Sequence, residues 1–237
     1  MKYLRLFQTV AEKQAATLDY PNVNYTIEND SLEIIAENPV QPFGGLTVKY
    51  NIVDATQEVT LFNGGGASSS SSSSSSSESG GGGALPSKMY VDGVEETPIN
   101  TWRFETTGEH IVQYEFADNI IPAGFLVSIT IATEAIIGDD ITEIADSSAA
   151  GGAFQGCTGL TTVTIGDSVT SIGSGAFQYS HLETLTVKAD TPPTLGSNAL
   201  ADSSITDIYV PASAVEAYKT STSTGWYEYA SIIQPIV

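Results

Sequence analysis

The sequence predicts a mainly β protein whose C-terminal part is a solenoid of short repeats, and three observations support this fold class. The pattern Leu-Thr-Thr-Val-Thr-Ile at 160–165 recurs as Leu-Glu-Thr-Leu-Thr-Val at 182–187. Apolar and polar residues alternate with a period of two in segments such as 46–53, which is typical of half-buried strands. A Gly/Ser tract at 64–83 offers almost nothing to bury, so we expect it to be disordered.

The composition restricts the partners of this chain. Its 237 residues include 28 acidic and 8 basic ones, which gives a net charge of −20. No Lys or Arg occurs between Phe104 and Val187, a stretch that holds eleven Asp and Glu residues. Such a surface repels phosphates, so we expect no nucleic-acid partner and no anionic membrane partner.

The sequence also lacks the signals of membrane insertion and export. No apolar run reaches the roughly 18–20 residues of a membrane span. Arg5 and Gln8 interrupt the apolar residues near the start, so we interpret this stretch as mature protein and not as a signal peptide. The alternative is that a signal peptide preceded this stretch and was removed.

Residues 1–40 are predicted to form a small α+β anchoring unit. Helix-forming residues fill 8–18, and the Asn29-Asp30 turn signal separates two short segments that alternate like strands. Forty residues are marginal for independent folding. We therefore expect this unit to dock onto a larger structure or onto copies of itself.

Residues 41–119 are predicted to form a small antiparallel β module. Strands are expected at 46–53 and 58–62, and Asp92-Gly93 is a hairpin signal. Residues 101–116 are interpreted as two paired strands around 106–109, with Trp102 and Phe104 opposite apolar residues of 111–116.

The Gly/Ser tract at 64–83 has two interpretations. It is either a linker between two domains or a long loop inside the β module. Because alternating segments lie on both sides of the tract, we favour the loop.

Residues 120–237 carry a repeat unit of 22 to 23 residues, a period typical of solenoids. Gly-Ala-Phe at 152–154 recurs at 175–177. An earlier, irregular copy is assigned to begin at Leu126, with its first strand in 126–131. This assignment makes the copy eleven residues longer than the others, through six extra residues before Ile141 and five extra residues after Ile144.

Each repeat supplies apolar residues to a shared core. The apolar area buried within one unit of about 23 residues cannot offset the conformational entropy that the unit loses on folding. The units must therefore stack on one another and be capped at the ends. The predicted repeat core consists of Leu160, Val163, Ile165, Val169, Ile172, Phe177, Leu182, Leu185, Val187, Ile205, Ile208 and Val210.

The segment from about residue 211 onward is predicted to cap the solenoid. Pro211 ends the repeat pattern, and a helix is expected to begin near Ser213. The aromatic residues predicted to cover the last coil are Tyr218, Trp226 and Tyr229.

The repeats and the ending "IYVPASAVEAYKTSTSTGWYEYASIIQPI" resemble BspA-like leucine-rich repeat proteins, over roughly residues 120–237. The resemblance implies a right-handed coil of short strands and turns that serves surface display and adhesion without catalysis. The chain departs from the family in having only three to four repeats. The first 118 residues are similar to virion proteins of tailed phages that infect Bacteroidetes, on segments such as "TVKYNIVDATQEVTLFN".

We find no catalytic, cofactor-binding or metal site in the sequence, and we predict that the protein is not an enzyme. Cys157 is the only cysteine and is interpreted as a buried side chain, although a dyad with His181 on an adjacent coil is a second reading. His110 is interpreted as a strand histidine. Asp139-Asp140 lacks the spacing of a calcium loop. A glycoside hydrolase would need paired carboxylates, and nothing pairs the glutamates between 95 and 109.

These observations lead to a hypothesis about function. We expect a virion structural protein, either a head fibre, a decoration protein or a tail-associated appendage, located on the virion surface. Residues 1–40 would contact other virion proteins, and the repeat domain would contact a glycan or protein of the host surface. A homo-oligomer, for example a trimer, fits a marginal anchoring unit. The alternative is a secreted bacterial adhesin at the cell surface.

Overall fold

The computed structural model describes residues 26–28, 31–33, 43–63 and 85–237. The chain divides into two units, Met1–Phe43 and Gly44–Val237. The predicted helix at 8–18 and the Gly/Ser tract lie outside the described residues.

The first unit contains one described hairpin. β1 (Thr26–Glu28) and β2 (Ser31–Glu33) pair antiparallel, with Ile27 opposite Leu32. Two strands are thus present on either side of Asn29-Asp30, as expected, whereas the turn residues themselves lie outside the described residues.

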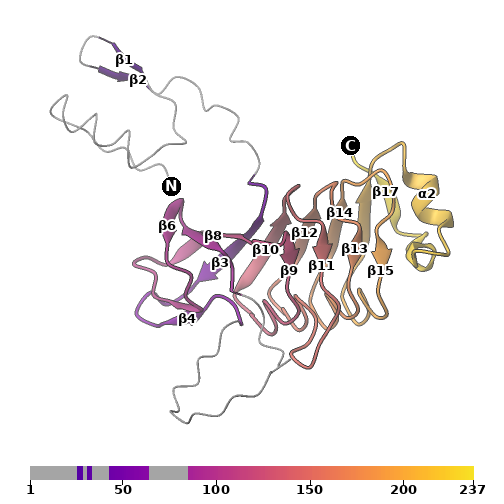
Figure 1. Cartoon of the computed structure of the whole chain (residues 1–237), viewed down its shortest axis with the longest axis horizontal. Coiled ribbons are helices and arrows are strands. Elements are labelled where there is room, and N and C mark those ends of the chain that lie inside the picture. Colours follow the sequence, from indigo (N-terminus) through magenta and orange to yellow (C-terminus); the bar gives the residue numbers. More distant parts are fainter. Residues whose placement is uncertain (1–25, 29–30, 34–42, 64–84) are drawn as a thin grey trace. The chain divides into compact units, whose positions relative to one another are not determined.

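The second unit is built on a nine-stranded sheet with the order β17-β16-β14-β12-β10-β3-β8-β5-β6 (Figure 1). Its strands are β3 (Leu46–Ile52), β5 (Lys88–Val91), β6 (Val94–Glu96), β8 (Gly108–Glu115), β10 (Ala132–Ile137), β12 (Thr162–Ile165), β14 (Thr184–Val187), β16 (Asp207–Val210) and β17 (Ile233–Pro235). The strands from β10 to β17 are parallel, whereas β3, β8, β5 and β6 pair antiparallel.

A second, parallel sheet completes the solenoid. It has the order β15-β13-β11-β9, and Figure 1 shows it as a row of short strands beside the larger sheet. Its strands are β9 (Ile120–Ile121), β11 (Glu143–Ile144), β13 (Ser171–Ile172) and β15 (Thr194–Leu195). Each coil contributes one strand to each sheet, so the mainly β solenoid predicted from the repeats is confirmed.

A column of turns forms the third side of each coil. Leu126, Phe154, Phe177 and Leu200 occupy equivalent positions in this column, because the N–H of each of the first three donates to a carbonyl of the next coil. The rings of Phe154 and Phe177 stack with centroids 4.8 Å apart. The small residues beside them allow close contact between coils: a Cβ on Gly152 would lie 2.1 Å from Gly175 O.

The first coil is more regular than the sequence suggested. Ile137, and not Ile131, pairs with Ile165. Ile141 then follows its strand by four residues, as Val169 does, so the predicted six-residue insertion is wrong. The alternation of residues 126–131 resembled a strand, but the Leu126 N–H bonds to Ala153 O, which places this segment in the turn column.

The five-residue insertion after Ile144 is present. Ile144 pairs with Ile172, and the following turn is five residues longer than its counterpart in the next coil. The extra residues include an isolated antiparallel bridge between Ser148 and Gly151. An insertion in the turn column therefore leaves both sheets in register.

The predicted pairing of residues 101–116 is wrong in part. β7 (Thr101–Trp102) pairs with β4 (Val59–Thr60), with Trp102 opposite Val59. β8 is instead flanked by β3 and β5, because both are longer strands than β7 and pair with β8 over more residues. The hairpin at Asp92-Gly93 is confirmed, and both turn residues have positive φ, 50° and 84°.

The antiparallel strands continue the sheet of the solenoid. β3 pairs with β10 on one side and with β8 on the other. The boundary expected near residue 119 therefore falls inside one compact unit. Strands on both sides of the Gly/Ser tract share this sheet, as a loop inside one unit requires.

Aromatic residues fill the core where the antiparallel strands meet the first coil. Phe125 of the first coil lies 5.1 Å from the ring centroids of Phe62, Tyr114 and Phe116. The Tyr50 hydroxyl donates to Leu61 O at 2.7 Å and lies 2.9 Å from the Tyr114 hydroxyl. Burial raises the pKa of both tyrosines, so both stay neutral in the core.

The C-terminal segment covers the last coil, as predicted. α2 (Val215–Thr220) buries Tyr218, and the 3₁₀ turn η1 (Trp226–Tyr229) buries Trp226. The Tyr218 hydroxyl donates to Ala189 O at 2.8 Å, and Trp226 Nε1 donates to Pro193 O at 2.7 Å. Among the helices that the structure describes, none combines the length and apolar content needed to span a bilayer.

Phe177 provides a test of the stacked core. Phe177→Ala should lower the free energy of unfolding by about 3–5 kcal/mol, because it removes a fully buried ring from between two coils. The matched control is Tyr179→Ala two residues later, where the side chain is 54% exposed and the change should stay within about 0.5 kcal/mol. Urea unfolding followed by circular dichroism measures both, and equal losses would contradict the assigned core.

Candidate functional site

The outer face of the large sheet carries two continuous rows of side chains. Along each parallel strand, buried residues alternate with half-buried ones that point outward. The pairing register aligns the outward residues across the sheet. One row is Lys49, Glu134, Thr162, Thr184 and Asp207, and the other is Gln113, Thr47, Ile136, Thr164, Thr186, Tyr209 and Gln234.

The middle of this face is a threonine patch, which we define as Thr162, Thr164, Thr184 and Thr186. The four side chains lie on β12 and β14 as two neighbouring Thr-x-Thr pairs. None of their hydroxyls has a hydrogen-bond partner among the residues that the structure describes. Because adjacent strands lie about 4.8 Å apart and alternate residues about 6.6 Å apart, the patch presents a regular grid of free hydroxyls.

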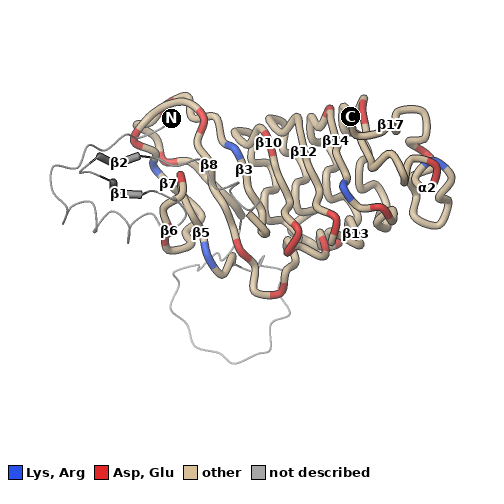
Figure 2. The backbone as a smooth tube through the Cα atoms, turned by 90° about the horizontal axis from the view of Figure 1, so that it is seen from above, with Lys and Arg blue, Asp and Glu red and all other residues tan. Residues whose placement is uncertain are grey.

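An ion pair borders the threonine patch on one side, and a hydrogen-bonded carboxylate borders it on the other. Lys49 Nζ lies 2.7 Å from Glu134 Oε2, and this hydrogen bond raises the pKa of Lys49. On the other side, Gln234 Nε2 donates to Asp207 Oδ1 at 2.6 Å. The four threonine side chains are themselves uncharged, although the protein is strongly acidic. Figure 2 shows the few basic positions among many acidic ones.

The residues predicted to form the repeat core lie inside the solenoid. Of the twelve, all but Ile205 are at most 1% exposed, and Ile205 packs against the core while partly buried. In the predicted cap, Tyr218 and Trp226 are fully buried, and Tyr229 is partly buried. These residues face the core and hold the sheet in place, whereas those of the outward rows face away from the core.

Cys157 lies in the core, where its thiol contacts a backbone carbonyl. Its Sγ donates to Leu126 O at 2.8 Å, and burial raises the pKa of the thiol to about 12. His181 lies on the next coil, where its backbone N–H donates to Cys157 O at 3.5 Å and the residue is exposed. The contact between the two residues is thus made by the backbone.

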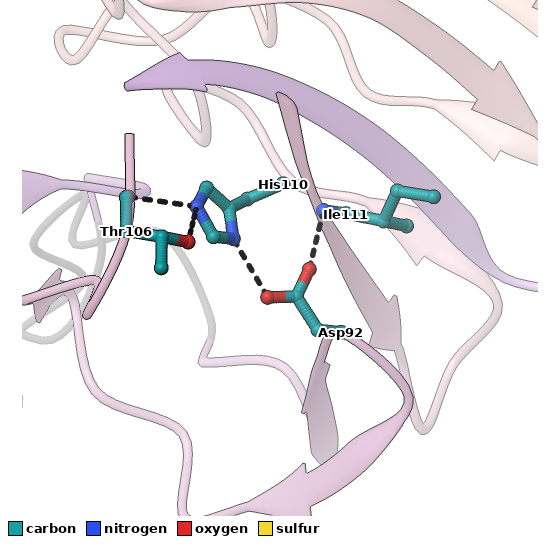
Figure 3. A network of polar contacts seen from close by, with 4 residues as sticks. All are labelled: Asp92, Thr106, His110 and Ile111. Carbon is teal, nitrogen blue, oxygen red and sulfur yellow. Dashed lines mark hydrogen bonds and ion pairs between the residues drawn. The ribbon is translucent and has the colours of Figure 1, made fainter. Parts of the chain in front are cut away.

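His110 belongs to a polar network that fastens the β5–β6 hairpin (Figure 3). Its Nδ1 lies 2.7 Å from Asp92 Oδ2, and its Nε2 lies 2.9 Å from Thr106 O. The Thr106 hydroxyl also lies 3.3 Å from Nε2, so each ring nitrogen has a polar partner. The Ile111 N–H donates to the other oxygen of Asp92 at 2.9 Å. The network therefore joins the Asp92 turn, the loop at Thr106 and strand β8.

The acidic residues considered as ligands or catalysts do not form a cluster. In the part of the chain that the structure describes, no three Asp, Glu, His or Cys side chains gather closely enough to hold a metal ion. Glu95 and Glu96 lie on β6, and Glu109 lies on β8 within 4.0 Å of Lys49.

Sequence reasoning missed the threonine patch, although a signal was present. The Thr-x-Thr pair at 162–164 recurs at 184–186, inside the repeat that was recognised. The apolar residues between the threonines define the core, and the threonines then necessarily point outward. Reading the polar residues of the repeat, as well as its apolar ones, would have found the patch.

Comparison with known proteins identifies the repeats. Residues 126–224 match the model of the BspA type leucine rich repeat region, in 6 copies. This part of the chain is therefore a BspA-type leucine-rich repeat region, and the three to four repeats expected from the sequence undercount the copies matched. A search of curated proteins gave no significant match.

The polar network at His110 can be tested by changing one atom. Asp92→Asn keeps the shape of the turn residue but removes its charge, so the hydrogen bond to His110 becomes a neutral one. We expect the free energy of unfolding to fall by about 1 kcal/mol. Glu95→Gln, an exposed change on the adjoining strand, should have almost no effect. Thermal unfolding measures both, and equal stability of Asp92→Asn and the unchanged protein would contradict the role of the network.

The buried thiol predicts a loss of stability in alkali. The unfolded thiol ionises near pH 9, whereas the pKa of the folded thiol is about 12. Between these values the unfolded state binds fewer protons, so Cys157 alone should lower stability by about 1.4 kcal/mol per pH unit. Urea unfolding at pH 8 to 10.5 should show a shallower decline for Cys157→Ala. Parallel pH profiles would contradict the assigned burial of the thiol.

Proposed function

We propose that this protein is a non-enzymatic adhesion-type protein that binds neutral polysaccharide on the threonine patch. The observation that carries the proposal is the grid of four outward hydroxyls without partners among the described residues, set on the rigid sheet of a BspA-type repeat region. Each hydroxyl can donate one hydrogen bond and accept others. A polymer with regularly spaced hydroxyl groups is a suitable partner for such a grid.

The charges around the patch favour a neutral glycan over an anionic one. The chain carries a net charge of −20, which repels sulfated, phosphorylated and carboxylated polymers. Lys49, the basic residue in the outward rows, is paired with Glu134. Binding of neutral sugar hydroxyls needs no counter-charge.

The side chains that flank the patch suit the apolar face of a sugar ring. Ile136 and Tyr209 adjoin the patch in the same row, next to Thr164 and Thr186 respectively. Both side chains are half-buried and therefore fixed in position while one face remains open. An aromatic ring offers large contact area at a small cost in conformational entropy.

The setting that we propose is a virion surface, with residues 1–40 contacting other virion proteins. The resemblance of the first 118 residues to phage virion proteins supports this setting. A secreted cell-surface adhesin would use the same patch. Gold-labelled antibody against residues 120–237 on purified phage particles should decorate a fixed position of the virion, and labelling of bacterial surfaces without phage would favour the adhesin.

The binding proposal can be tested by removing hydroxyls without changing shape. The probes are immobilised mannan and β-glucan, with heparin as an anionic polymer of similar size. We expect retention on at least one neutral polymer and none on heparin. The variant Thr164→Val/Thr186→Val should lose at least about tenfold in apparent affinity, because the two hydroxyls between Ile136 and Tyr209 are gone.

A matched control makes the same two Thr-to-Val changes outside the patch. Thr142→Val/Thr170→Val removes two hydroxyls beside the smaller sheet, where they bond to Asn119 O and Thr142 O and do not belong to the patch. This control should retain binding. Equal binding by both double variants, or stronger retention on heparin than on the neutral polymers, would contradict the proposal.

A further inference from the structure

The turn column joins successive coils by a repeated pair of backbone hydrogen bonds. In each interface, two N–H groups of one coil donate to two carbonyls of the next, at alternate residues. In the first interface, the N–H groups of Leu126 and Ser128 donate to the carbonyls of Ala153 (2.7 Å) and Gln155 (2.8 Å). In the second, those of Phe154 and Gly156 donate to Ala176 (2.7 Å) and Gln178 (2.9 Å). In the third, those of Phe177 and Tyr179 donate to Ala199 (2.8 Å) and Ala201 (3.3 Å). The equivalent donors in the last coil are the N–H groups of Leu200 and Asp202.

The C-terminal segment closes the two sheets but leaves the turn column open. β17 pairs with β16 at the end of the large sheet. Thr224 O accepts the Leu195 N–H at 3.0 Å at the end of the smaller sheet. No residue that the structure describes accepts the N–H of Leu200 or of Asp202. Leu200 is only 2% exposed, so its donor is nearly removed from bulk water.

A pocket lies at this open end. Its volume is about 370 Å³, and it lies between the last turn of the column and η1. Small residues make up much of its wall, including Gly196, Ala199, Ala201 and Gly225, so a polypeptide backbone can approach closely. Asn198 and Glu228 supply polar side chains, and Tyr229 supplies an aromatic wall.

The opposite end of the turn column is closed by one residue of the chain. The Asn63 N–H donates to Phe125 O at 2.6 Å, and its Nδ2 donates to Val127 O at 2.5 Å. Asn63 thus supplies the two donors that a preceding coil would supply. A second copy of the protein therefore has no free carbonyls at this end with which to continue the column.

We propose that the pocket at the open end of the turn column docks a short segment of a partner polypeptide. The segment would accept the N–H groups of Leu200 and Asp202 with backbone carbonyls at alternate residues, as each coil of the solenoid does for its neighbour. Its residues at the contact would be small, like those of the coils. Its flanks would be basic, because Glu228 lines the pocket, Asp202 directly follows the lining residue Ala201 in the chain, and the whole chain carries a charge of −20.

This site is separate from the threonine patch. The residues that line the pocket come from the end of β15, the turn column and the cap, and none of them lies in the two outward rows of the sheet. The inference therefore goes beyond the proposed function, and either can fail without the other.

The test uses the full chain and a synthetic peptide. The probe has the sequence of residues 173–180, Gly-Ser-Gly-Ala-Phe-Gln-Tyr-Ser, which forms this turn within the solenoid, with two lysines added at each end. Nuclear magnetic resonance titration should shift the amide signals of Leu200 and Asp202 and slow their exchange with solvent. Ser197→Trp, which fills the pocket from its exposed rim, should weaken binding by roughly tenfold or more.

Two controls separate backbone docking from charge attraction. The mirror-image peptide has the same charge but the opposite chirality, and it should not bind. Glu228→Lys should weaken the peptide about two- to fivefold, whereas Glu183→Lys, an exposed change outside the pocket, should leave the affinity within error. Any of four results would overturn the proposal. These are equal binding of both peptides, signal shifts confined to other residues, no binding at millimolar peptide, and self-association of the protein through these amides.

Discussion

The hydrogen bonds between successive coils are the constraint on which this fold depends. A single repeat buries too little apolar area to fold, and its backbone donors and acceptors point toward the neighbouring coils. The parallel pairings of both sheets and the pairs of bonds in the turn column satisfy these groups together. The buried side chains follow from this register, because stacking the backbone also stacks residues such as Phe154 on Phe177.

The same constraint explains the ends of the solenoid. The first coil would expose the edge of β10, and β3 covers that edge by antiparallel pairing, which brings β8, β5 and β6 into the same sheet. Asn63 closes the turn column at this end with one backbone and one side-chain donor. At the other end, β17 and Thr224 close the two sheets. The turn column ends in the N–H groups of Leu200 and Asp202, which no described residue accepts.

The sequence predicted those features that depend on the alternation of side chains along the chain. Val163, Leu185 and Ile208 were recognisable as core because their spacing repeats. The pairing of β3 with β10 was not recognisable, because it joins segments about 85 residues apart and no local pattern marks it. Residues 126–131 were misassigned because alternation also fits an irregular turn. The open donors of Leu200 and Asp202 belong to the backbone and leave no trace in residue type.

The two proposed contact sites differ in the kind of group that they present, and this difference determines their partners. The threonine patch offers side-chain hydroxyls on a flat sheet, so it suits a polymer that lies across several strands. The open turn column offers backbone donors in a small pocket, so it suits one polypeptide segment of defined hand. The negative charge of the chain acts on both sites in the same direction, since it disfavours anionic partners at each. The two proposed partners would therefore contact different groups of the repeat domain and would not compete with each other.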